Sequence, residues 1–115
     1  MGNVNKVIII GNLGADPELK RTAAGQGYCH LSVATDHVFK DKTGQRQTQT
    51  EWHRVTVWGE LAERCAQHLL KGRSVFIEGR LETDTWEDDQ KVRRRSTRVI
   101  AARVEFLDAP AREAA

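Results

Sequence analysis

The feature that most constrains the fold is a change of hydrophobic period after Gly59. In "ELAERCAQHLLKG" (60–72), apolar residues recur every four positions, which is typical of one face of an amphipathic helix. Two glutamates in the first turn, Lys71 in the last turn and Gly72 directly after it are typical of helix ends. The sequence therefore predicts one short helix that stops at Gly72, in a chain whose other apolar segments have the patterns of strands.

Five strand-like segments surround this helix. They are residues 7–10, 28–35, 50–59, 74–81 and 96–107. In the fourth segment, we expect Val75, Ile77 and Leu81 to point inward. The polar segment 39–50 is predicted to be the tip of a long hairpin, and the polar segment 82–94 is predicted to be a loop.

Five strands with one helix between the third and the fourth predict an all-β fold, a five-stranded OB-fold Greek-key barrel. An open sandwich covered by the helix is the structural alternative. We expect the barrel to span residues 1–108 as one domain. Residues 109–115 lack a strand pattern and are expected to form a short disordered tail.

Composition narrows the class of protein. The 115 residues include 18 Lys and Arg against 16 Asp and Glu, and the net charge of +2 is too small to indicate a polyanionic partner by itself. Cys29 and Cys65 are too few for a disulfide framework and fit a reducing compartment. No apolar run approaches the roughly 20 residues of a membrane span. We therefore expect a cytoplasmic protein without a membrane partner.

The sequence offers no catalytic or metal-binding motif. Cys65 and His68 lie three residues apart on the predicted helix, but no second pair has matching ligand spacing. There is no nucleophile motif, no phosphate-binding glycine loop and no carboxylate pair in a recognisable pattern. We expect no enzyme activity, no cofactor and no metal, and we interpret Cys65 as a small core residue.

Two of the three tryptophans lie on one side of the strand "TEWHRVTVWG" (50–59). A period of two places Trp52, Arg54 and Trp58 opposite Val55 and Val57, which are expected to face the core. The two tryptophans are about 20 Å apart along an extended strand. We expect both rings to be exposed. Exposed apolar rings often mark a protein contact, so the alternative to a ligand-binding surface is that one tryptophan covers the mouth of the barrel and the other lies in a subunit interface.

Aromatic rings and cations together are typical of a surface that binds single-stranded nucleic acid, because rings stack on bases while cations pair with phosphates. The rings expected to stack are Phe39, Trp52, Trp58 and Trp86. The cations expected to contact phosphates are Arg54, Lys40, Lys42, Arg46, Lys91, Arg93, Arg94, Arg95 and Arg98. The alternative for the basic block 91–98 is a solvated segment that the acidic residues upstream of it neutralise.

Three segments resemble bacterial-type single-stranded DNA-binding proteins. They are "NKVIIIGNLGADPELK" (5–20), "TEWHRVTVWGELAE" (50–63) and "LLKGRSVFIEGRLETDTWED" (69–88). The resemblance implies an OB-fold and a homotetramer that wraps single-stranded DNA through aromatic stacking and basic contacts. It further implies a role in DNA replication, recombination and repair at the nucleoid, and it maps the family's stacking positions onto the four rings above.

The resemblance also places His53 at a subunit contact. Phe76 alternates outward between two inward residues, so His53 and Phe76 are the predicted oligomer-interface residues. Edge pairing of the short apolar first strand with its twin would support a homotetramer.

Members of that family usually continue into a flexible linker and an acidic tip that recruits replication and repair proteins. This chain ends at "PAREAA", so it is either cut short or a short paralogue, and recruitment of those proteins is left open. An RNA-binding OB-fold and a dimeric replication-restart relative are the remaining alternatives, because contacts to the RNA 2′-hydroxyl leave no mark in the sequence.

Overall fold

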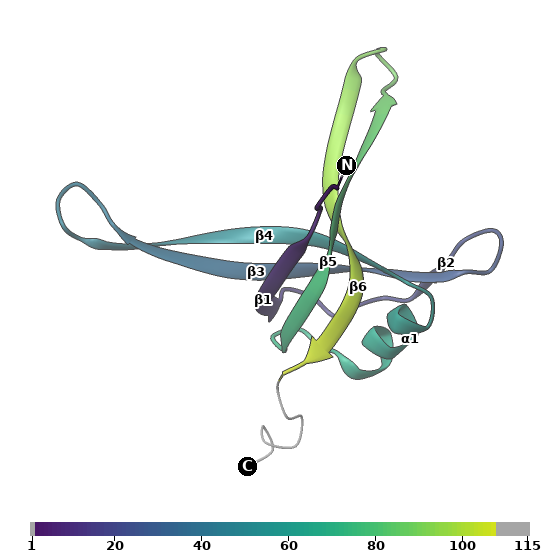
Figure 1. The fold of residues 1–115 in the computed structure, drawn as a ribbon, viewed down its shortest axis with the longest axis horizontal. Coiled ribbons are helices and arrows are strands. Elements are labelled where there is room, and N and C mark those ends of the chain that lie inside the picture. The colour runs from purple at the N-terminus through teal and green to yellow at the C-terminus, as the bar shows by residue number, and fades with distance from the viewer. Residues whose placement is uncertain (1, 108–115) are drawn as a thin grey trace.

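The structure is a computed structural model that describes residues 2–107. Its elements are β1 (Val7–Leu13), β2 (Lys20–Arg21), β3 (Gly27–Lys40), β4 (Arg46–Trp58), α1 (Gly59–His68), β5 (Ser74–Glu87) and β6 (Arg93–Phe106), as Figure 1 shows. Residue 108, the predicted end of the barrel domain, and the predicted tail 109–115 lie outside the described residues.

Five strands close into a barrel. The sheet order is β1-β5-β6-β4-β3, and pairing between β1 and β3 completes the ring. Neighbouring strands are antiparallel except β4 and β6, which run parallel. The helix α1 lies between β4 and β5, the third and fourth strands of the barrel, so the predicted OB-fold is confirmed. The two-residue strand β2, which the sequence did not predict, adds to the edge of β3.

The core fills the barrel with the residues that alternate inward. Cys29, Leu31 and Val33 of β3 are buried together with Val55 and Val57 of β4. The helix covers one end of this core with Ala62, Cys65 and the following Leu69. Val75 and Ile77 are buried as predicted, whereas Leu81 is 47% exposed and the prediction for it was wrong. Leu81 belongs to the part of β5 that has left the barrel.

Two close strand approaches need glycine. A methyl group on Gly79 would clash with the backbone carbonyl of Ile100, and one on Gly11 would clash with that of Ala34. The register of β5 against β6 shifts at Glu78 and Gly79, which is a β-bulge. A bulge bends a strand and increases its twist, and this allows a small sheet to close on itself.

Two hairpins extend beyond the barrel as arms in different directions (Figure 1). The β3–β4 arm stays paired out to Lys40 and Arg46, and the β5–β6 arm out to Glu87 and Arg93. The predicted loop 82–94 is therefore mostly strand, and that prediction was wrong. The segment is polar because both faces of the hairpin are open to water. Backbone hydrogen bonds between β5 and β6 hold it, although neither face packs against the core.

The helix ends earlier than predicted. α1 stops at His68, and Leu69, in an extended conformation, turns its side chain into the core at 1% exposure. Lys71 is therefore not in the last turn, and Gly72, at φ 91°, belongs to a separate turn instead of stopping the helix. The amide of Gly72 donates to the carbonyl of Leu13 at 2.8 Å, so this turn is anchored to β1. Leu69 thus fits the four-residue period of the helix but lies outside it, with its side chain buried in the core.

Candidate nucleic-acid interface

The outer face of β4 carries Trp52, Arg54, Thr56 and Trp58, and we refer to it as the tryptophan face. Trp52 is 58% exposed, as the sequence predicted. Trp58 is only half-buried, so the expectation of two fully open rings holds for one of them. Thr56 is 1% exposed even though it lies on this outer face, and its Oγ1 lies 3.2 Å from the Nδ1 of His30 on the neighbouring strand.

The two tryptophans are held differently. The Trp52 ring lies directly over Gly14, where any β-carbon would clash with the ring. Trp58 packs against Tyr28, with ring centroids 5.1 Å apart and an interplanar angle of 37°. Trp52 is therefore an isolated flat surface on a backbone support, whereas Trp58 is one member of an aromatic cluster.

A pocket of about 290 Å³, which we name the arginine pocket, lies between the positions of the two tryptophans along β4. Its lining residues are Ala15, His30, Leu31, Ser32, Arg54, Thr56 and Arg98. The register pairs His30 with Thr56 and Ser32 with Arg54, so their side chains lie side by side on the outer surface. The pocket thus has two guanidinium groups, an imidazole and two hydroxyl groups, and no carboxylate lines it within residues 2–107.

Parallel pairing of β4 with β6 brings the second arginine to this pocket. Val55 pairs with Val99 and both point inward, so Arg54 and Arg98 point outward next to one another. Arg54 also donates from Nη1 to the Oγ of Ser96 at 3.2 Å. The two arginines are 44 positions apart in sequence numbering, so only the closed barrel brings them together.

The β5–β6 arm divides the basic block between its two faces. Trp86 pairs with Arg94, and alternation places both on the same side as Arg98. Arg93 and Arg95 point to the opposite side of the arm. The structure therefore places Trp86 and Arg94 on the same side of the arm as Arg98, which lines the arginine pocket, and it places Arg93 and Arg95 on the other side. Lys91, another member of the predicted set, lies in the turn at φ 62°.

The β3–β4 arm separates Phe39 from Trp52. Ala34 pairs with Trp52, and Phe39 is five residues further on, so alternation places it on the opposite side of the arm. There its ring stacks on His37, with centroids 5.7 Å apart. The arm's three predicted cations are divided as well: Lys40 and Arg46 pair with one another on the Trp52 side, and Lys42 lies in the terminal turn.

Carboxylates engage part of the predicted cationic set. Arg98 contacts Glu82 at 3.1 Å and Asp84 at 3.4 Å, and Arg94 contacts Asp88 at 2.9 Å. Hydrogen bonds from Arg98 and from Arg80 lower the pKa of Glu82. The backbone amide of residue 92 and then Arg94 lower the pKa of Asp88. Glu82 and Asp88 therefore stay ionised at neutral pH, and a phosphate meets cations that already have an anionic neighbour.

His30 lies at the edge of the arginine pocket with its Nδ1 3.2 Å from the Oγ1 of Thr56. Burial lowers the pKa of His30, and the positive charges of Lys20, Arg98 and Arg54 lower it further. The imidazole is therefore neutral at pH 7, and it fills the pocket wall without adding a third charge next to the two guanidinium groups.

A second, apolar surface lies on the outer side of β1 and β5. Ile8 and Ile10 are 61% and 60% exposed, and Ile10 pairs with Phe76. Phe76 is half-buried under the guanidinium of Arg103, 5.6 Å from the ring centroid. We name Ile8, Ile10 and Phe76 the apolar face. His53 lies elsewhere, half-buried on β4.

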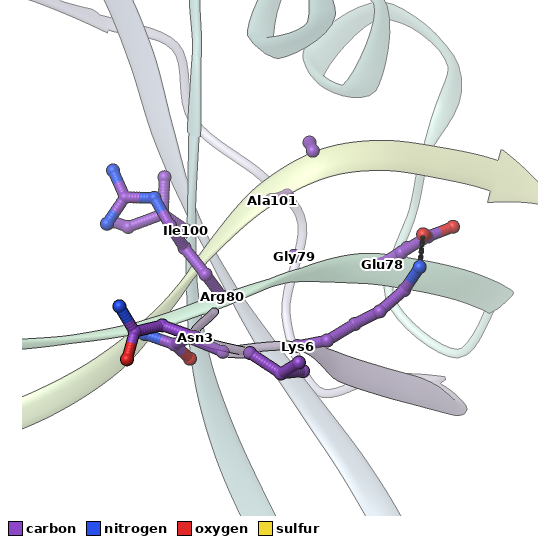
Figure 2. Close-up of a pocket in the computed structure, with 10 residues that line it drawn as sticks. Asn3, Lys6, Glu78, Gly79, Arg80, Ile100 and Ala101 are labelled. Carbon is purple, nitrogen blue, oxygen red and sulfur yellow. Dashed lines mark ion pairs between the residues drawn. The ribbon is translucent and has the colours of Figure 1, made fainter. Parts of the chain in front are cut away.

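An open pocket of about 430 Å³ adjoins the apolar face, between the N-terminal segment and the bulge of β5 (Figure 2). The ion pair of Lys6 with Glu78, at 2.7 Å, borders it. Hydrogen bonds in both directions between Asn5 and the backbone of Leu81, each 2.9 Å, hold the N-terminal segment in place. No tryptophan lines this pocket, so its chemistry differs from that of the tryptophan face.

Neither cysteine nor histidine forms a reactive centre in the part of the chain that the structure describes. No group of three or more His, Cys, Asp or Glu side chains within residues 2–107 is placed to hold a metal ion. Cys29 and Cys65 are both free and fully buried, which confirms Cys65 as a core residue. Hydrogen bonding to Cys29 and burial raise the pKa of the Cys65 thiol, so it is unreactive. No described helix is long and apolar enough to cross a bilayer.

The sequence reasoning missed Tyr28, His30 and Ser32 as members of this surface. A signal for all three was present, because they alternate with the buried residues of β3 and must share its outer face. Which strand lies beside β3, and in what register, could not be read from that alternation.

Comparisons with known proteins agree with this geometry. A curated relative, "Single-stranded DNA-binding protein 1" of Chlorobaculum tepidum, is 45% identical over 107 residues. The match covers 92% of this chain, and the chain spans 66% of that relative's length. The family model described as "Single-strand binding protein family" matches residues 4–107.

Two solved structures have the same fold. One is titled "Plasmodium falciparum SSB complex with ssDNA", with a TM-score of 0.85, 28% identity, and coverage of 94% of this chain and 98% of that chain. The other is a deletion mutant of the single-stranded DNA binding protein from Thermus aquaticus, with a TM-score of 0.81, 33% identity, and coverage of 94% of this chain and 52% of that chain. Because the family model matches almost all of the described residues, the chain belongs to the single-strand binding protein family.

Proposed function

We propose that the protein binds single-stranded DNA without sequence preference and protects it during replication, recombination and repair. The observation that carries the proposal is the tryptophan face, where Trp52 and Trp58 flank a pocket with two guanidinium groups. Rings stack on any base and cations pair with any phosphate, so binding to this surface does not depend on the base sequence. It is a binding surface, and the protein acts without catalysing a reaction.

The names of the relatives support this proposal. The Chlorobaculum tepidum relative is named a single-stranded DNA-binding protein, and the Plasmodium falciparum structure is titled as a complex with single-stranded DNA. The arm residues Trp86 and Arg94 lie on the same side as the arginine pocket, so they extend the surface beyond the barrel. Phe39 and the cations of the β3–β4 arm supply further contacts to a strand that wraps around this arm.

The proposal is tested by a tryptophan-fluorescence titration with oligo(dT), repeated with a duplex of the same length. Stacking on bases should quench the indole emission with the single strand and leave it almost unchanged with the duplex. A competition between poly(dT) and a matched RNA separates DNA binding from RNA binding. Equal quenching by duplex, or no response to oligo(dT), would contradict the proposed function.

We further propose that the protein is a homotetramer and acts in the cytoplasm at the nucleoid. The apolar face supports assembly, because Ile8 and Ile10 would gain burial in a contact between copies. Phe76 adjoins them and belongs to the same contact. His53 is the second interface candidate, although its Nε2 already lies 2.9 Å from the Oγ1 of Thr35 in its own chain.

Light scattering of the protein and of an Ile8→Lys variant tests the assembly. The lysine would place a charge in the middle of the apolar face, so the mass should fall from four chains to fewer. Val4→Lys is a matched control, because Val4 is 92% exposed and lies outside the apolar face as defined. The mass of a His53→Lys variant tests in the same way whether His53 lies in a subunit interface. A mass of one chain at micromolar concentrations would contradict the tetramer.

A further inference from the structure

We propose that the arginine pocket is a discrete binding site for one phosphate group of the bound strand, held by Arg54, Arg98 and the hydroxyl group of Ser32. This inference rests on the proposed function and specifies how the strand passes between Trp52 and Trp58. Bases stack on the two rings, and the phosphodiester between them descends into the pocket instead of lying on an open surface.

The first support is the position of the pocket on the strand. Arg54 is two residues from Trp52 and four from Trp58, so the pocket lies about 7 Å and about 13 Å from the two rings along β4. The volume of about 290 Å³ is several times the roughly 30 Å³ of one water molecule in the liquid. A phosphate group therefore fits between the rings without displacing either of them.

The second support is the set of unused donors. The ion pairs of Arg98 with Glu82 and Asp84 both use Nη2. Its Nε is buried and has no hydrogen-bond acceptor among residues 2–107. An atom so buried is closed to a phosphate in this conformation, so the donors of Arg98 that a phosphate can reach are those of Nη1, which contacts no carboxylate among residues 2–107. Arg54 has no carboxylate partner among the described residues, so most of its five donors are also available.

The third support is the absence of carboxylates from the lining together with the placement of His30. The Ser32 hydroxyl adds a donor without a negative charge, whereas the Thr56 hydroxyl is buried and lies 3.2 Å from the Nδ1 of His30. The neutral imidazole keeps the pocket from holding three adjacent positive charges in the free protein. A phosphate would stabilise the protonated form of His30, so binding of the strand should draw a proton onto this ring.

Arg98→Gln is the direct test, and Arg80→Gln is its matched control. Both arginines contact Glu82 at 3.1 Å, so each substitution removes one positive charge and one partner of the same carboxylate. Only Arg98 lines the arginine pocket. We expect Arg98→Gln to lower the slope of log affinity for oligo(dT) against log salt by up to about 0.7, the value for one full phosphate contact on a single strand, because Glu82 and Asp84 already offset part of its charge. Arg80→Gln should leave the slope nearly unchanged.

A nuclear magnetic resonance titration of His30 gives an independent readout that a merely structural role of Arg98 would not move. The pKa of His30 should rise when oligo(dT) binds the unaltered protein and the Arg80→Gln variant, and it should rise less in Arg98→Gln. Melting temperatures identify any variant that fails to fold, and Ser32→Val then tests the pocket without removing a charge, with a loss of affinity expected.

The outcomes distinguish this inference from the proposed function. If the unaltered protein does not bind oligo(dT), both are wrong. If it binds with a clear salt dependence, but Arg98→Gln and Arg80→Gln have the same slope and His30 does not respond, the phosphate site is wrong and the proposed function stands. A loss of affinity in Arg98→Gln without a change of slope would show that the pocket holds a base, and would also overturn the inference.

Discussion

Replacing Trp52 with alanine isolates the contribution of one stacking ring. Trp52 is 58% exposed and rests on Gly14, so its ring is supported by backbone and has a free upper side. In the free protein that side faces water, and in the complex we expect a base to cover it. The substitution should therefore lower DNA affinity more than it lowers the stability of the fold.

The structure gives a magnitude for each effect. A fully buried tryptophan removes roughly 150–250 Å² from water, so the buried two fifths of Trp52 amount to about 80 Å². At about 25 cal/mol per Å², Trp52→Ala should lower the free energy of unfolding by at most about 2 kcal/mol. Loss of one stacked base should weaken oligo(dT) binding by roughly 1–3 kcal/mol, which is about 5- to 150-fold.

Affinity, mass and urea unfolding should be measured on the same preparations of three proteins: unaltered, Trp52→Ala and Trp58→Ala. Trp58 is half-buried against Tyr28, so its substitution should cost more stability for a similar loss of affinity. The stacking argument would be refuted if folded Trp52→Ala bound oligo(dT) as tightly as the unaltered protein. A changed mass with unchanged affinity per assembled particle would instead assign Trp52 to a subunit contact.

Three further predictions concern the β5–β6 arm, the arginine pocket and the bulge. Arg94→Gln should lower the salt slope of oligo(dT) binding by up to about 0.7, because Asp88 already offsets part of its charge, whereas Arg95→Gln, on the other side of the β5–β6 arm, should lower it less. Equal slopes would mean that the strand contacts both sides. Burial and nearby cations hold the pKa of His30 below its usual value, so the unfolded chain binds more protons than the folded chain as the pH drops below about 6.5. The free energy of unfolding should therefore fall through that range, and that of a His30→Gln variant should fall less steeply. Gly79→Ala should lower the free energy of unfolding by about 1–3 kcal/mol in urea because its methyl group meets a backbone carbonyl of β6, while Gly2→Ala, in open space, should change nothing.

The order and type of the main elements could be predicted because two hydrophobic periods are clearly separated in this sequence. Alternating valines mark β4, and the four-residue period after Gly59 marks α1. One helix inserted after the third strand is enough to favour this barrel over other small all-β folds. Those signals come from elements with one face in the core and one face in water, because only the core face needs apolar residues.

The arms and the helix end could not be predicted because no hydrophobic pattern marks them. Thr83 and Thr97 face one another across the β5–β6 arm, their hydroxyl oxygens 2.9 Å apart, in a ladder held by backbone hydrogen bonds with water on both sides. The polar composition of residues 82–94 favours a loop over a strand. Leu69 fits the helical period but leaves the helix, because the core needs its side chain in a position that only an extended backbone reaches.

The site could be predicted residue by residue but not as an arrangement. Alternation within β4 identified Trp52 and Arg54 correctly as neighbours on one outer face. It could not show that Arg98 joins them, because that depends on the parallel register of β4 with β6. Nor could it show that Phe39 lies on the other side of its arm, since counting from Trp52 requires the length of the turn between the two strands.

The near-neutral net charge becomes consistent with a polyanionic ligand once the ion pairs are considered. Glu82, Asp84 and Asp88 hold Arg98 and Arg94 on the side of the arm that carries the aromatic ring, and Glu82 and Asp88 have lowered pKa values, so they remain ionised. A phosphate that arrives there meets a cation that a carboxylate already partly neutralises. Such a contact releases fewer counterions than the count of basic residues suggests. The salt dependence of binding should therefore arise mainly from cations without a carboxylate partner among residues 2–107, of which Arg54 in the arginine pocket is the most central.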